Sequence, residues 1–102
     1  MHLVFTSVKK KSDANRMADA LMKNELAACV TFWPVRSAYK WKGKMVKEKE
    51  FLLEIKTAHA SRVRKWLEEN HPYDVAMIYG IKADRVSSAY EKWVNGKRKA
   101  RG

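Results

Sequence analysis

The stretch that decides the fold is residues 26–57, which read LAACVTFWPVRSAYKWKGKMVKEKEFLLEIKT. In its first part, 26–41, apolar residues occupy even positions up to Phe32 and odd positions from Tyr39 onward. This alternation predicts a strand of unusual length that changes phase midway. Pro34 lies between the two halves, and a bulge or bend there would absorb the phase change, because proline cannot donate to a central ladder.

The second half of this stretch predicts the return of the chain. Lys42-Gly43 supplies a tight turn, since glycine accepts a positive φ. Residues 45–57 then alternate again, with Phe51, Leu53 and Ile55 on one face. Residues 26–57 therefore predict one long β-hairpin.

Outward from the hairpin, residues 2–8 alternate and are rich in β-branched and aromatic types, which predicts a first strand. Between the two lies a predicted helix, with Ser12 as its N-cap, Asp13 in its first turn and its end near Asn24. Its apolar residues follow the spacing of one helical face: Ala14, Met17, Ala18 and Leu21.

After the hairpin, a second helix is predicted from about Ala58 to Asn70, with Val63, Trp66 and Leu67 facing inward. His71-Pro72 ends it, because the residue before proline avoids the helical region. Residues 74–82 predict a last strand.

A final helix is predicted after that strand, with Asp84 as its N-cap and Asn95-Gly96 at its end. The order strand, helix, strand, strand, helix, strand, helix is the split βαβ pattern. We therefore predict an α+β, ferredoxin-like fold over 1–96 with an added C-terminal helix, and a basic, disordered tail at 97–102. Both crossover helices should lie on one sheet face, which leaves an aromatic-bearing face open and in need of a partner.

Composition limits the protein's class and compartment. The 102 residues carry a formal net charge of +11, with 46% hydrophobic residues and a single cysteine. No apolar run approaches the ~20 residues of a membrane span, and the start of the chain does not resemble a signal peptide. One cysteine cannot form an internal disulfide, so we expect a cytoplasmic protein that does not engage a membrane.

The positive charge makes nucleic acid or an anionic surface a candidate partner. The basic residues are nevertheless spread over Lys9-Lys10-Lys11, the hairpin lysines and the tail 97–102. Scattered lysines also serve solubility or guard strand edges, so we expect nothing beyond nonspecific electrostatic binding to nucleic acid.

Catalytic motifs are absent from the sequence. The four glycines are isolated, so no phosphate-binding loop can form, and no zinc-binding motif or nucleophile elbow occurs. We therefore predict that the protein is not an enzyme and requires no cofactor.

Metal binding remains as a candidate chemistry. Cys29 and His71 offer thiolate and imidazole, which suit soft or borderline ions, notably copper(II). Their strands should lie at opposite edges of the sheet, so the two would meet only between protomers. The alternatives are a buried apolar role for Cys29 and, for His71, hydrogen bonding within its own turn. Glu50 is the third candidate ligand; its alternative is a weak ion pair.

Other residues are candidates for a cleft between subunits. Lys56 and Asp74 either face such a cleft or form salt bridges between subunits, and Tyr39, Trp41 and Tyr73 either stack on a ligand or form interface core.

Five blocks follow one another in fixed order between Thr6 and about Trp93: Leu26-Ala27-Ala28-Cys29-Val30, Ser37 to Lys44, Glu50 to Thr57, His71-Pro72-Tyr73-Asp74-Val75, and Tyr90-Glu91-Lys92-Trp93. In these blocks the chain resembles the CutA-type divalent-cation-tolerance proteins. The resemblance implies a ferredoxin-like homotrimer with a role in metal tolerance. It also marks Cys29 and His71 as positions where metal has been proposed to bind.

The chain departs from that family pattern at two places. The segment Ser7-Val8-Lys9-Lys10-Lys11, before the first predicted helix, is more basic than the family pattern. Ala76-Met77 stands where the family usually has Pro-Glu, which removes a carboxylate from the cleft. Two other functions stay open: a PII-like signalling module that holds a small anion between subunits, and a nonspecific nucleic-acid-binding domain.

Overall fold

The computed structural model describes residues 1–96, and the predicted basic tail lies outside the described residues. The elements follow in the predicted order: β1 (His2–Val8), α1 (Lys11–Lys23), β2 (Cys29–Trp41), β3 (Lys44–Thr57), α2 (Ala60–Asn70), β4 (Ile78–Lys82) and α3 (Ser88–Val94). The sheet has the strand order β2-β3-β1-β4, and all neighbours are antiparallel. This confirms the α+β, ferredoxin-like class.

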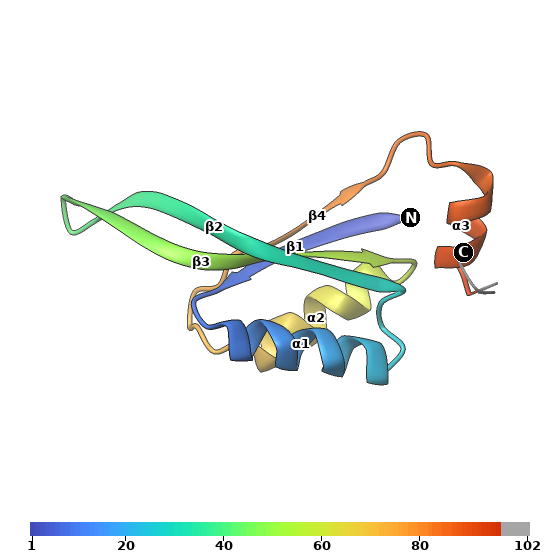
Figure 1. The fold of residues 1–102 in the computed structure, drawn as a ribbon, viewed down its shortest axis with the longest axis horizontal. Helices are drawn as coiled ribbons and strands as arrows, with labels where there is room; N and C mark the ends of the chain where they lie inside the picture. Colours follow the sequence, from blue (N-terminus) through green and yellow to red (C-terminus); the bar gives the residue numbers. More distant parts are fainter. Residues whose placement is uncertain (97–102) are drawn as a thin grey trace.

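Helices α1 and α2 lie side by side on one face of the sheet (Figure 1). Their apolar stripes meet every second residue of β1 and β3, because strand side chains alternate between the two faces. The most deeply buried side chains of this core are Val4, Val8, Leu21, Leu53, Ile55, Val63 and Leu67. The core therefore fills only the space between the helices and one sheet face.

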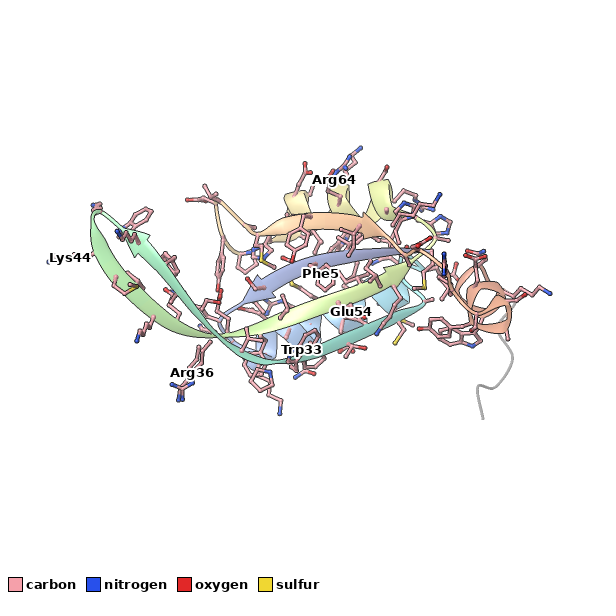
Figure 2. All side chains as sticks on the ribbon, turned by 90° about the horizontal axis from the view of Figure 1, so that it is seen from above. Phe5, Trp33, Arg36, Lys44, Glu54 and Arg64 are labelled. Atoms are coloured by element: carbon pink, nitrogen blue, oxygen red, sulfur yellow. The ribbon has the colours of Figure 1, made fainter. Side chains whose placement is uncertain are left out.

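The opposite sheet face is open and largely apolar, as predicted. Figure 2 looks down on this face, with Phe5, Trp33 and Glu54 labelled. Phe5 stacks on Tyr79 across β1 and β4 with ring centroids 5.3 Å apart. Tyr79 is 48% and Ile81 50% exposed, so this face buries little apolar surface within one chain.

The hairpin β2–β3 runs well beyond the ends of the two helices (Figure 1). Its tip is the predicted Lys42-Gly43 turn, in which both residues have positive φ, 50° and 77°. This geometry matches the right-handed twist of the flanking strands.

Of the two alternatives predicted at Pro34, a bulge or a bend, the bulge is absent. The register continues from Cys29↔Lys56 through Pro34↔Phe51 to Trp41↔Lys44 without an extra residue. Proline is tolerated because β2 is an edge strand. The strands twist around each other near Arg36 (Figure 2). Alternation is unbroken, so Phe32 lies on the helix side of the sheet, whereas Tyr39 and Trp41 lie on the open side.

Other boundaries also differ from the predictions. Residues 26–28 precede β2 but are buried. The last strand begins at Ile78 rather than near residue 74, and Val75 is 93% exposed.

Neither predicted N-cap is correct. Ser12 lies inside α1, whose first hydrogen bonds are accepted by the Lys10 carbonyl, and α3 begins after Ser87 rather than Asp84. Packing of the apolar stripe sets helix starts more strongly than a capping side chain does.

Helix α3 lies beyond the end of the sheet, near the N-terminus (Figure 1). The Met1 ammonium lies 3.7 Å from the Glu91 carboxylate, and the Ala83 N–H donates to the Met1 carbonyl. Val94 is buried. Across residues 1–96, every helix is too short or too polar to cross a bilayer.

Candidate functional site

The part of the hairpin away from its tip carries two carboxylates on one face. Glu48 and Glu50 are two residues apart in β3, so strand alternation places both on the continuation of the open sheet face. Their partners across the ladder are Ser37 and Val35. Together with the groups that contact them, directly or through Ser7, they form what we call the carboxylate cluster: Ser7, Lys9, Tyr39, Glu48, Glu50, His71 and Tyr73.

Glu48 is held by a hydroxyl and an ammonium. The Tyr39 hydroxyl donates to Glu48 Oε1 at 2.7 Å, and Lys9 Nζ lies 3.2 Å from the same oxygen. The Tyr39 hydrogen bond lowers the pKa of Glu48, and Lys9 adds to that effect. The same bond, together with the nearby carboxylates, raises the pKa of Tyr39. Glu48 is therefore ionised and Tyr39 neutral near pH 7.

Glu50 is joined to the loop before β4 through the end of β1. The Ser7 hydroxyl donates to Glu50 Oε1 at 3.3 Å, and the Ser7 carbonyl lies 3.0 Å from His71 Nε2. The Tyr73 N–H donates to His71 Nδ1 at 3.1 Å. Because Nδ1 accepts that bond, the neutral imidazole carries its proton on Nε2 and donates it to Ser7.

Both ring nitrogens of His71 are thus engaged within the chain. This is the arrangement that a histidine bonding its own turn would adopt. Burial lowers the pKa of His71, and the Ser7 bond opposes that effect only in part. To ligate a metal ion, His71 would first have to release one of its two partners.

Tyr73 packs beside His71, with ring centroids 4.9 Å apart and an edge-on geometry. Burial raises the pKa of Tyr73, and the charges of Glu50 and Glu48 raise it further. Asp74 is exposed and, with His71 and Tyr73, lines an open hollow of about 290 Å³.

Cys29 and Lys56 are direct partners across β2 and β3, so both side chains lie on the open sheet face. Cys29 is only partly buried, which differs from the alternative of a buried apolar role. Lys56 contacts the Thr31 hydroxyl and lies 3.2 Å from the Glu54 carboxylate. The side chains of this ion pair are only 15% and 27% exposed, although no helix among residues 1–96 covers this face (Figure 1).

Trp41 lies apart from both groups. It is 64% exposed at the hairpin tip, where Lys42 Nζ lies 6.0 Å from the ring centroid. Its ring is available for contact with another molecule.

The structure therefore divides the predicted site residues. Glu50, Tyr39, His71 and Tyr73 belong to one cluster, with Asp74 beside it. Cys29 and Lys56 lie six residues further along the ladder from Val35↔Glu50, which is roughly 20 Å. Within residues 1–96 no three histidine, cysteine or acidic side chains come together as a metal site.

The sequence interpretation missed three members of the cluster: Ser7, Lys9 and Glu48. The alternation of lysine and glutamate over 47–50 was the available signal for Glu48, because it separates the two charges onto opposite faces. No local pattern indicates Ser7 or Lys9, since Ser7 reaches the cluster through the pairing of β1 with β3 and Lys9 follows directly after β1.

Comparison with known proteins gives a consistent result. Residues 2–97 match the model of the family described as CutA1 divalent ion tolerance protein. The divalent-cation tolerance protein CutA of Pectobacterium atrosepticum is 36% identical over 85 residues, which cover 80% of this chain and 77% of that protein.

Solved structures agree in fold. The crystal structure of CutA1 from Pyrococcus horikoshii OT3 with the mutation D60A has a TM-score of 0.90 and 32% identity, covering 98% of this chain and 100% of the other. CutA from Synechococcus elongatus PCC7942, complexed with a Bis-Tris molecule, has a TM-score of 0.85 and 28% identity, covering 95% and 92%.

Proposed function

Because this chain belongs to the CutA1 divalent ion tolerance family, we propose that it serves divalent-cation tolerance as a homotrimer without catalytic activity. In this proposal each trimer binds copper(II) or another soft divalent cation at sites between subunits. The observation that carries the proposal is the open sheet face with the partly exposed Cys29 on it.

The open face supports assembly. Its exposed apolar side chains include Trp33, Tyr79 and Ile81, and within residues 1–96 no layer removes them from water. The Lys56–Glu54 pair on the same face already satisfies its charges within the chain. A partner could therefore cover this face without burying an unpaired charge.

The ligand types support a soft cation. Cys29 supplies a thiol, which as thiolate prefers copper and zinc over magnesium and calcium. Cys29 in β2 and His71 before β4 belong to opposite edges of the sheet, so the proposed site draws its ligands from two chains.

The carboxylate cluster favours a cation over the small anion of a PII-like module. Glu48 and Glu50 lie on one face, and among residues 1–96 the ammonium in contact with them is that of Lys9. The hydrogen bond to Glu48 raises the pKa of Tyr39, and the charges of Glu50 and Glu48 add to the larger effect of burial in raising the pKa of Tyr73. An anion placed there would meet the same repulsion.

The proposed compartment is the cytoplasm, on the basis of the single free cysteine. A related structure, that of CutA from Archaeoglobus fulgidus, is described as periplasmic. Fractionation of the native host would decide this point for the present chain.

The test is metal analysis of the purified protein beside Cys29→Ala, followed by copper(II) titration at pH 7. We expect Cys29→Ala to weaken copper binding by about tenfold or more, since losing even an outer-shell partner of a metal ligand costs about 10- to 100-fold in affinity and this variant removes a direct ligand. His71→Ala should have a smaller effect, because its nitrogens are already bonded in the free chain. Binding should also weaken below about pH 6, as protons compete for the ligands.

Glu50→Gln serves as the third variant and keeps the size of the side chain. Sedimentation equilibrium must give a trimer for the parent and for each variant. If all three variants bind copper like the parent, the metal assignment is wrong. A monomer at micromolar concentration would contradict the assembly.

A further inference from the structure

The projecting hairpin separates its charges by face. Over residues 35–50, strand alternation puts Glu48 and Glu50 on the face that continues the open sheet face. The opposite face carries cations and no acid. We call this second surface the basic face: Arg36, Lys40, Lys47 and Lys49.

The basic face brings like charges together. Arg36 pairs directly with Lys49 across the ladder, and Ala38 pairs with Lys47 beside them. Like charges at directly opposed positions destabilise a sheet. Within residues 1–96, none of the four side chains of the basic face forms an ion pair.

The basic face is also uncovered. All four of its residues are exposed, and α1 and α2 end before the hairpin projects (Figure 1). Arg36 points away from the strands where they cross, with Lys44 at the tip beyond (Figure 2). Assembly through the open sheet face would leave these cations in solvent.

We propose that the basic face binds the phosphate backbone of nucleic acid without sequence preference. Alternate residues on a strand are roughly 7 Å apart, so Arg36 to Lys40 spans about 13 Å, and Lys47 and Lys49 add a second row beside it. An array of this shape fits an extended polyanion rather than a compact anion. Counterion release would supply the binding free energy.

The composition of the face defines the kind of recognition. The remaining side chains between Arg36 and Lys49 on this face are Ala38 and Met45. It therefore offers neither the amide groups that read base edges nor an aromatic platform for stacking. A lipid surface fits less well, because amphipathic membrane binders bury a larger apolar face.

The experiment measures anisotropy of a fluorescein-labelled 20-base single-stranded DNA at about 50 to 200 mM salt. The parent is compared with Arg36→Gln/Lys47→Gln/Lys49→Gln. The matched control is Lys23→Gln/Arg62→Gln/Lys65→Gln, which loses the same charge from exposed positions on α1 and α2. Sedimentation equilibrium confirms that each protein assembles like the parent.

We expect the basic-face variant to bind at least tenfold more weakly at about 50 mM salt. The slope of log K against log salt should fall by about 2, because three phosphate contacts at ~0.7 each are lost. The helix-face control should change less than about threefold. Lys47→Gln alone should lower the slope by ~0.7, which keeps the test valid if the triple variant fails to assemble.

Three results would overturn the proposal. Equal losses in both triple variants would mean that only net charge acts. If the parent does not bind DNA at about 50 mM salt, the proposed binding does not occur. Tighter binding to phosphatidylserine vesicles than to DNA, lost in the basic-face variant, would assign the surface to membranes instead.

Discussion

The covered part of the sheet and the projecting hairpin belong to the same two strands but are stabilised differently. Where α1 and α2 cover β3, Leu53 and Ile55 are fully buried. Where the hairpin extends past the helices, Trp41 and Met45 are each 64% exposed. The first region buries its own apolar surface, and the second keeps both faces in solvent.

This contrast shows how one chain assigns its residues to two tasks. Side chains on the helix side of β3 determine whether the monomer folds. Side chains on the open face and in the hairpin are free to contact other molecules, because they contribute little to the core. Substitutions in the two regions should therefore produce different kinds of defect.

The largest expected effect is at Leu53. Leu53→Ala should lower the free energy of unfolding by about 3 kcal/mol, because it leaves a cavity in a fully buried site. Leu52→Ala, its neighbour on the open face, is the matched control. Urea unfolding at two protein concentrations checks this: the Leu53 defect should persist at both, whereas the Leu52 defect should depend on concentration. Equal and concentration-independent defects would remove the distinction between the faces.

A smaller effect is expected at the hairpin tip. Trp41→Ala should weaken assembly by about 2 kcal/mol, since exposed aromatic rings often become interface anchors. The monomer's own unfolding should change little. Sedimentation equilibrium of parent and variant measures the association constant. An unchanged constant would show that the tip lies outside the interface.

The smallest effect concerns pH. Burial places the pKa of His71 below its ordinary value of 6.5 in the folded chain. His71 therefore binds a proton more readily in the unfolded chain than in the folded chain. His71 therefore contributes stability that is present above about pH 6.5 and is lost as the pH falls through its lower folded pKa. Urea midpoints at pH 7.5 and 5 should differ more for the parent than for His71→Gln. A parent that gains stability on acidification relative to this variant would contradict the sign.

Much of the fold was predictable because local patterns and tertiary packing agree. The alternation of 51–57 and the helical spacing of Ala14, Met17 and Leu21 both match the observed core. Of the bulge or bend predicted at Pro34, the bulge was wrong, because the sequence does not say which strand is at the edge. Ser12 and Asp84 were wrong as caps, since capping propensity is weaker than packing.

The candidate site was less predictable. Residue type identified Cys29 and His71, but not that Cys29 lies on the open face beside Lys56 or that both nitrogens of His71 are bonded. These facts depend on register and on contacts between residues far apart in the sequence. Whether metal binds at these residues stays a prediction.

The two-residue turn at Lys42-Gly43 also bears on how the chain folds. Trp41 and Lys44 pair with each other and are separated only by the two turn residues. Pairing of His2 with Thr57, in contrast, must close more than half of the chain into a loop. Loop closure costs more entropy as the loop lengthens, and hairpins form within about 1–10 μs. We therefore expect β2 and β3 to pair before β1 joins them. During that interval the strand edges are unprotected, and the lysines along the hairpin would repel other nascent chains by charge and so limit aggregation.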